Sequence, residues 1–217
     1  MELLLKWVLM ATVQLAATMS PGPAFVVAVR NAMIYDRKTA VSTAFGLSLG
    51  VAAHVGFVLV GLAFLIAQSI FLYNFIKYAG AAYLLYIGIK AIISAKKAQS
   101  DADQDHLDIT AEDEHKIKKM SIPKAIITGF LTNLLNPKAV IFFTAVYSQF
   151  ITPDTPFFMH LLYGATSVVI EFTWFALLGV ILTNPRLKMM FSRGMQWVER
   201  VCGGFMIALG LKLALSK

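Results

Sequence analysis

The 217-residue chain has little charge and almost no cysteine. Only 14% of its residues are Asp, Glu, Lys or Arg, against about 25% in an ordinary soluble domain, while 58% are apolar. The single cysteine, Cys202, excludes an internal disulfide and any chemistry that needs a cysteine pair. No charged residue occurs in 7–29 or in 39–76, and roughly 20 apolar residues are enough to cross a bilayer. These shortages exclude a soluble globule and a disordered chain, and they predict an all-α integral membrane protein.

Six transmembrane helices fit between the charged segments. The apolar N-terminal stretch continues to Arg30, so we interpret it as the first span and not as a cleaved leader. We place the spans near residues 5–29, 39–66, 76–95, 124–150, 156–183 and 199–215.

The basic residues are distributed unevenly between the loops. The segments between spans 1 and 2, 3 and 4, and 5 and 6 hold 13 of the 19 Lys and Arg residues, whereas the opposite side holds only Lys6, Lys77 and Lys217. Basic residues collect in cytoplasmic loops, so we expect both termini to lie outside. The same bias accounts for the net charge of +7 without a nucleic-acid partner.

One long charged loop, residues 96–123, separates the spans into two groups. It carries seven of the 12 acidic residues. Four acids match positions 1, 3, 5 and 12 of a calcium-binding loop, namely Asp101, Asp103, Asp105 and Glu112. Position 6 of that pattern, which is usually glycine, is His106 here. We therefore favour a solvated loop over a weak divalent-ion site.

The two flanking segments, 1–95 and 124–217, resemble one another. TMSPGP at 18–23 aligns with LLNPKA at 134–139, and AAYLLYIGIKAI at 81–92 aligns with GGFMIALGLKLA at 203–214. Each half holds three spans, so the second copy crosses the membrane in the opposite sense. The sequence therefore predicts two inverted three-helix repeats, a plan found in secondary transporters.

Prolines interrupt spans 1 and 4 near the middle of the membrane. Ser20-Pro21 is typical of a helix start, with serine as the cap and proline at the first helical position. We therefore expect a half-helix to begin at Pro21, and Asn136-Pro137 to repeat this arrangement in span 4. Two helix N-termini at the midplane, with Lys138 beside them, suit a carboxylate. The alternative is a pair of proline kinks with a snorkelling lysine.

Two titratable residues lie inside apolar runs. Glu171 is the only acid within 155–185, and the spacing of the repeats brings His54 to within one residue of it. A carboxylate and an imidazole inside a membrane can carry protons, so we hypothesise that they couple proton entry to solute exit. The alternatives are a hydrogen bond across helices for His54 and an ion pair with Lys138 or Lys90 for Glu171.

A serine motif in span 2 has a weaker claim to chemistry. Residues 46–50 read GLSLG, which matches the G-x-S-x-G pattern of serine hydrolases. That motif needs a strand-to-helix turn, and this segment is expected to be continuous helix. We therefore do not expect an enzyme.

Long stretches of the chain resemble a known transporter family. SPGPAFVVAVRNAMIYDRKTAVSTAFGLSLG (20–50), NLLNPKAVIFF (133–143) and the GIKAI ending of span 3 resemble the LysE/RhtB amino-acid exporters. The resemblance covers nearly the whole chain except the acidic loop. It implies a bacterial inner-membrane carrier that exports amino acids or close derivatives by proton antiport, as a homodimer. The alternative is an ion or metal permease. We expect no cofactor.

The resemblance also implies a central binding site at the two helix breaks. An amino acid additionally needs an acceptor for its ammonium group, for which the carbonyls of 17–20, Asn133, Asn136 and Glu171 are candidates. The predicted substrate-binding residues are Ser20, Pro21, Gly22, Pro23, Asn133, Asn136, Pro137 and Lys138.

Overall fold

The computed structural model describes residues 2–68, 120–152 and 154–183, together with single helical positions between 78 and 93 and between 200 and 211. Every element of the described part is a helix, which confirms the all-α prediction. The six helices are α1 (Glu2–Met19), α2 (Pro23–Ile34), α3 (Arg37–Gln68), α5 (Ile122–Leu134), α6 (Pro137–Phe150) and α7 (Phe157–Leu182).

Several of these helices have the dimensions of membrane spans. Glu2–Met19, Arg37–Gly61 and Phe157–Leu182 are each long and apolar enough to cross a bilayer. Helices α5 and α6 meet the same test as a pair and are bent by 60° at the connection between them. The predicted spans 76–95 and 199–215 lie mostly outside the described residues. Cys202 and residues 96–119 of the charged loop lie wholly outside them.

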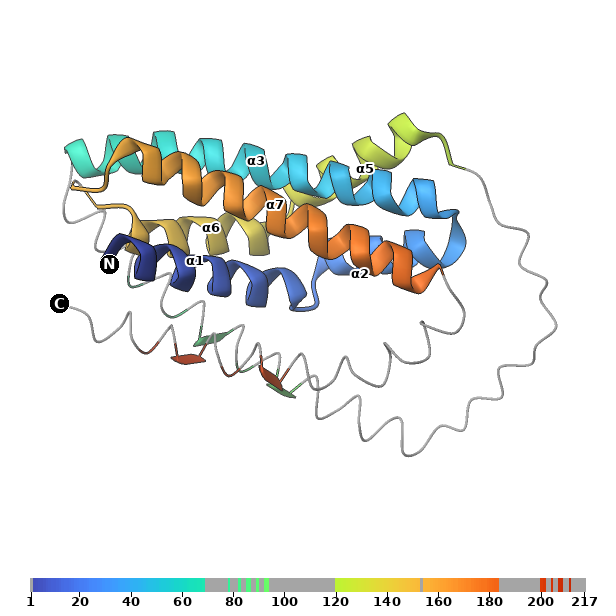
Figure 1. The fold of residues 1–217 in the computed structure, drawn as a ribbon, viewed down its shortest axis with the longest axis horizontal. Helices are drawn as coiled ribbons and strands as arrows, with labels where there is room; N and C mark the ends of the chain where they lie inside the picture. The colour runs from blue at the N-terminus through green and yellow to red at the C-terminus, as the bar shows by residue number, and fades with distance from the viewer. Residues whose placement is uncertain are drawn as a thin grey trace.

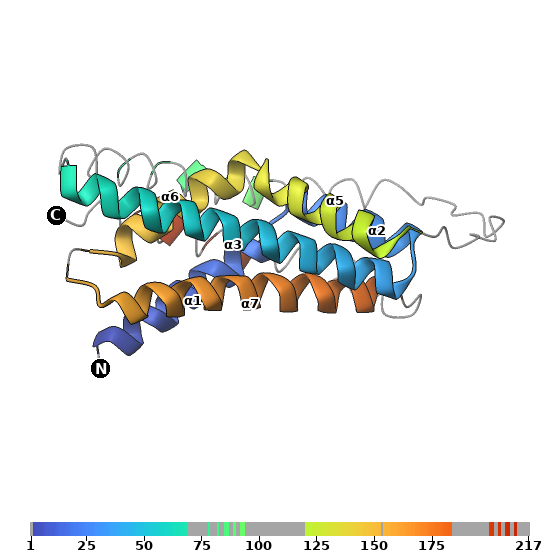
Figure 2. The same cartoon turned by 90° about the horizontal axis from the view of Figure 1, so that it is seen from above.

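The helices run side by side along one long axis (Figures 1 and 2). Helices α1 and α2 follow one another and both pack against α7, while α3 runs back along the bundle and packs on both α5 and α7. The first basic loop, between α2 and α3, and the start of α5 lie at one end of the bundle (Figure 1). The N-terminus and the loop between α6 and α7 lie at the other end. Segments that were predicted to lie on opposite sides of the membrane are therefore at opposite ends of the bundle.

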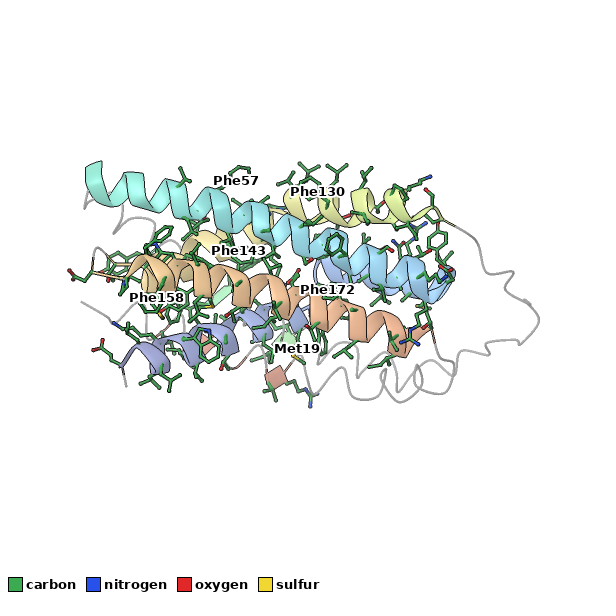
Figure 3. The ribbon with its side chains drawn as sticks, turned by 45° about the horizontal axis from the view of Figure 1, so that its top comes forward. Met19, Phe57, Phe130, Phe143, Phe158 and Phe172 are labelled. Carbon is green, nitrogen blue, oxygen red and sulfur yellow. The ribbon has the colours of Figure 1, made fainter. Side chains whose placement is uncertain are left out.

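The bundle carries apolar side chains outside and a set of polar ones inside. Phe57 is 68% exposed on α3, whereas Phe143 is 2% exposed inside the bundle (Figure 3). Polar residues are buried on every helix, among them Gln14, Asn31, Thr43, Asn133, Ser167 and Glu171. A lipid-facing exterior explains the exposed apolar side chains, because apolar surface needs no cover in a bilayer.

Glycines bring α3 and α5 into backbone contact. A Cβ atom built on Gly46 would overlap the carbonyl oxygen of Ile126, and one built on Gly129 would overlap the carbonyl oxygen of Thr43. At Gly50 the nearest atom, Cβ of Asn133, would be only 2.7 Å away. Small residues allow helices in a membrane to approach this closely, and here they fix the position of the C-terminal end of α5.

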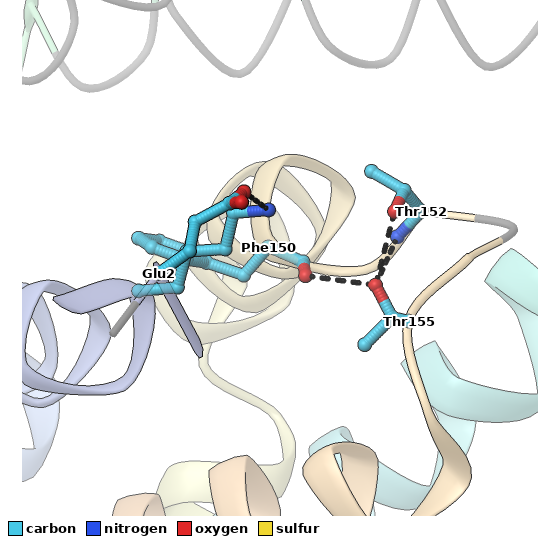
Figure 4. Close-up of polar contacts among 5 residues, drawn as sticks. Glu2, Phe150, Thr152 and Thr155 are labelled. Carbon is cyan, nitrogen blue, oxygen red and sulfur yellow. Dashed lines mark hydrogen bonds and ion pairs between the residues drawn. The ribbon is translucent and has the colours of Figure 1, made fainter. Parts of the chain in front are cut away.

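A threonine pair shapes the turn between α6 and α7. The hydroxyl of Thr155 accepts from the backbone N–H of Thr152 at 2.9 Å and donates to the carbonyl of Phe150 at 3.3 Å (Figure 4). Pro156 then precedes the first residue of α7. Side-chain hydrogen bonds thus satisfy a backbone that turns sharply without regular structure.

The start of α2 differs from the expectation. The helix begins at Pro23 and not at Pro21, and its N-cap is Gly22, with no side-chain capping bond from Ser20. The backbone of Gly22 is fully extended, with φ −179° and ψ −176°, so the chain is not yet helical there. Of the two prolines that could open the helix, the second one does, because a residue directly before a proline is disfavoured in the helical conformation and Gly22 precedes Pro23.

Candidate functional site

The two proline-containing connections lie next to each other in the middle of the bundle. Helix α1 ends at Met19 and α2 begins at Pro23, while α5 ends at Leu134 and α6 begins at Pro137. From this point α2 and α6 run in opposite directions (Figure 1). The N-terminal residues of both helices line one cavity, which also receives side chains from α1, α5 and α7.

The N-terminus of α6 is capped as predicted. The side-chain oxygen of Asn136 accepts a hydrogen bond from the backbone N–H of Lys138 at 3.0 Å, and Pro137 occupies the first helical position. Proline fits there because its missing N–H would have had no partner within the helix.

Lys138 joins the two connections. Its ammonium group donates to the carbonyl oxygen of Ser20 at 3.1 Å and to that of Pro21 at 3.2 Å. A cation at the N-terminus of its own helix is unfavourable, but these carbonyls extend the negative end of α1, where a cation is stabilised. Gly22 leaves room for the lysine, since a Cβ atom there would lie 3.2 Å from Cδ of Lys138.

Glu171 is buried at the centre of a hydrogen-bonded chain. It is 5% exposed, and its carboxylate accepts from the hydroxyl of Thr18 at 2.8 Å and from the amide of Asn133 at 3.1 Å. The same amide donates to the carbonyl of Leu47 at 2.8 Å. Helices α1, α3, α5 and α7 are therefore tied together through one carboxylate and one asparagine.

His54 contacts the same asparagine from another side. Its Nε2 donates to the backbone carbonyl of Asn133 at 2.9 Å, and its ring stacks on Phe143 with centroids 5.9 Å apart. It lines a separate, mostly apolar pocket of about 370 Å³ and does not line the central cavity. The structure thus contains the cross-helix hydrogen bond that was the alternative interpretation of this residue.

The central cavity has a volume of about 50 Å³, enough for a few water molecules in this conformation. Its walls combine apolar surface with one ammonium group, one carboxylate and several neutral polar groups. The lining residues that matter below are Gln14, Thr18, Ser20, Gly22, Ala24, Phe25, Asn133, Asn136, Lys138 and Glu171. Opposite charges in one cavity suit a small zwitterion, because each charged end of the solute meets its complement.

The structure brings together most of the predicted binding residues. Ser20, Gly22, Asn133, Asn136 and Lys138 line the cavity with Glu171. The carbonyl of Pro21 holds Lys138, whereas Pro23 and Pro137 act as the first residues of their helices. Lys90 and the calcium-pattern acids Asp101, Asp103, Asp105 and Glu112 lie outside the described residues.

Gln14 is a polar residue of the cavity that was not predicted. It lies on α1 one turn before Thr18, and its amide donates to the Thr18 hydroxyl at 3.1 Å. An amide inside a charge-free run is a signal in itself, because an unsatisfied polar group in a membrane is unfavourable. Its spacing of four residues from Thr18 would have placed both on one face of a helix.

The serine motif has no catalytic geometry. Residues 46–50 lie within the uninterrupted helix α3, and the hydroxyl of Ser48 donates to the carbonyl of Phe45 at 2.8 Å. Among the residues that the structure describes, no three His, Cys, Asp or Glu side chains gather as a metal site.

A multi-pass helical bundle with a buried, charged cavity at two helix breaks is the architecture of a membrane transporter. The family model described as LysE type translocator matches residues 15–217. The chain therefore belongs to the LysE family of translocators, and it is a transporter and not an enzyme.

Curated relatives extend over the whole chain. The threonine efflux protein of Salmonella typhi is 27% identical over 215 residues, which cover 99% of this chain and 100% of the relative. The threonine efflux protein of Escherichia coli K12 is 26% identical over 215 residues, again covering 99% of this chain and 100% of the relative. A homoserine/homoserine lactone efflux protein of Salmonella typhimurium is 29% identical over 156 residues, 71% of this chain and 69% of the relative. No solved structure matches the chain.

Proposed function

We propose that the protein exports a small amino acid by proton antiport, and that the solute binds in the central cavity. The observation that carries the proposal is the presence of Lys138 and Glu171 in the lining of one buried cavity. An isolated charge in a membrane is unfavourable by several kcal/mol, so charged residues there mark solute or proton pathways. The names of the threonine and homoserine relatives support an amino acid as the solute.

The carboxylate of the solute would bind at the donor end of the cavity. Lys138 supplies a full positive charge, and the first turn of α2 has no side-chain cap for its N–H groups. Ala24 and Phe25, in that first turn, line the cavity. Uncapped N–H groups and a helix dipole favour an anion at such a place.

The ammonium group of the solute would bind beside Glu171, and this suggests how protons are coupled. A buried carboxylate needs one neutralising positive charge, which either an ammonium group or a proton can supply. Solute and proton then exclude one another from Glu171. When the solute leaves on the outer side, a proton replaces it and is later released inside. His54 reaches Glu171 through Asn133, which makes it the second proton-coupling candidate.

The proposed transport cycle uses the predicted repeats. In this proposal residues 1–95 and 124–217 are inverted three-helix repeats, and the α1–α2 and α5–α6 connections lie at the midplane of broken spans. The two repeats would rock about the cavity to expose it to either side. Both termini would lie outside the bacterial inner membrane, and the carrier would be a homodimer.

The test is exchange in proteoliposomes. Vesicles loaded with unlabelled L-threonine are given labelled L-threonine, L-homoserine or other amino acids, with and without an imposed pH gradient. We expect exchange of at least one amino acid, accelerated by the gradient. Glu171→Gln should abolish the acceleration, and His54→Ala should weaken it.

Asp154→Asn is the matched control, because Asp154 lies in the α6–α7 turn and does not line the cavity. It should behave as wild type. If folded wild-type protein exchanges no amino acid, the proposed substrate class is wrong. If it exchanges amino acids and both Glu171→Gln and His54→Ala keep the response to the gradient, the proposed coupling is wrong.

A further inference from the structure

We propose that Gln14 is the neutral acceptor that holds the ammonium group of the solute beside Glu171. This inference rests on the proposed function and assigns one further residue to the same site. Gln14 is 2% exposed and lines the central cavity, and its side-chain oxygen has no hydrogen-bond partner among the residues that the structure describes. A buried acceptor without a donor is unfavourable, so this oxygen is available to a donor group of a bound solute.

The orientation of the Gln14 amide follows from its neighbours. The Thr18 hydroxyl uses its single hydrogen to donate to Glu171 at 2.8 Å. The oxygen of Thr18 can therefore only accept from Gln14, and it does so from the amide nitrogen at 3.1 Å. Flipping the amide would place two acceptors against each other. The nitrogen is thus fixed on Thr18, and the oxygen is the end that is left for a donor.

The hydrogen bonds also place the Gln14 amide close to the carboxylate. Gln14 and Glu171 are both bound to the hydroxyl of Thr18, so they belong to the same part of the cavity wall. An ammonium group has three N–H donors. The carboxylate already accepts from Thr18 and Asn133, and a neighbouring amide oxygen offers a further acceptor without adding charge.

The neutrality of Gln14 has a consequence for the exchange. With one carboxylate and one amide, this part of the site holds a single negative charge, which one ammonium group or one proton neutralises. A second carboxylate at position 14 would demand a second positive charge. The glutamine therefore recognises an ammonium group while keeping the exchange at one solute for one proton.

The test is a thermodynamic cycle in which one group is removed from the protein and one from the ligand, and the four affinities are compared. Binding of L-threonine and of 3-hydroxybutanoate, which lacks the ammonium group, is measured by calorimetry on purified wild type and Gln14→Met. Methionine has nearly the same length and volume as glutamine but no acceptor. We expect the preference for L-threonine to fall by about tenfold to a hundredfold in Gln14→Met, the range for a hydrogen bond to a charged group. If another amino acid is the substrate found by exchange, it and its deaminated analogue replace this pair.

Gln149→Met is the matched control, since Gln149 lies on α6, does not line the cavity, and donates from its amide to the Ala145 carbonyl at 3.4 Å. It should keep the wild-type preference. A packing defect in Gln14→Met would weaken both ligands equally, so an unchanged preference overturns the inference even when affinity falls. If Gln14→Met does not fold, Gln14→Asn, which withdraws the oxygen by one methylene, gives the same readout. Wild type that binds no amino acid would instead overturn the proposed function.

Discussion

The backbone contact between α3 and α5 predicts opposite effects for two glycine substitutions on one helix. Gly46 and Gly56 both lie in α3. A Cβ atom on Gly46 would overlap the backbone of Ile126, whereas one on Gly56 would meet no atom of the described residues within 4 Å. Gly46→Ala and Gly56→Ala therefore add the same methyl group to the same helix, and only the first adds it to an occupied space.

The magnitudes follow from two effects. Alanine is favoured over glycine inside a helix by about 1 kcal/mol, and both variants gain this. Overpacking in a closely packed contact is unfavourable by about 1–3 kcal/mol, because one backbone must move. We expect Gly56→Ala to be stabilised by up to about 1 kcal/mol, and Gly46→Ala to be about 2 kcal/mol less stable than Gly56→Ala.

Thermal unfolding in detergent micelles measures this difference. For a chain of this size, about 2 kcal/mol corresponds to a difference in melting temperature of roughly 4–8 °C. Gly129→Ala, whose Cβ would overlap the carbonyl of Thr43, should repeat the result from the α5 side. Equal melting temperatures for Gly46→Ala and Gly56→Ala would refute the close contact and the placement of Asn133 that depends on it.

Three further substitutions test individual contacts. Lys138→Ala should abolish binding of L-threonine in a calorimetric titration. Added methylammonium should partly restore this binding, because it can occupy the place of the lysine at the carbonyls of Ser20 and Pro21. No restoration would contradict the role of these carbonyls as a cation site. Asn136→Ala removes the cap of α6 and should lower stability by about 1 kcal/mol in thermal unfolding, so an unchanged melting temperature would count against the cap. Trp7→Phe removes the 3.0 Å hydrogen bond to Thr166 that links α1 to α7 and should lower stability by about 1 kcal/mol. The comparison is Trp174→Phe, which should not lose this stability because Trp174 makes no such bond among the described residues.

The helices were predictable because their signals are local. Charge-free runs exceed the length of a bilayer, and proline stops a helix whatever lies around it. Asn136 was correctly identified as a cap, since the group that it binds, the backbone N–H of Lys138, lies only two residues further along the chain. Ser20 was not a cap, because Gly22 stays extended before Pro23 and the helix begins only there. The carbonyls of Ser20 and Pro21 bind Lys138, which lies more than a hundred residues away in the sequence. Sequence spacing contains no information about such a partner.

The site was predictable in its composition but not in its connections. Glu171 was singled out because it is an acid in an apolar run, and the structure places it in the cavity with Lys138. Gln14 was missed, since its importance depends on the Thr18–Glu171 bond between α1 and α7. His54 aligned with Glu171 in the repeats, yet it faces a different pocket. Periodicity gives the face of a helix and leaves open which helix packs against that face.

The glycine contacts described above also divide the bundle into stiff and pliant parts. Backbone atoms of α3 and α5 touch directly, so these two helices can shift relative to each other only by separating. Helix α6, in contrast, is held by side chains: Lys138 binds the α1–α2 connection, and Phe142, Phe143 and Val146 share one apolar cluster with residues of α1, α3 and α7. Side chains can change rotamer when helices shift, whereas two touching backbones cannot. We therefore expect the α3–α5 pair to keep its spacing when other contacts of the bundle change.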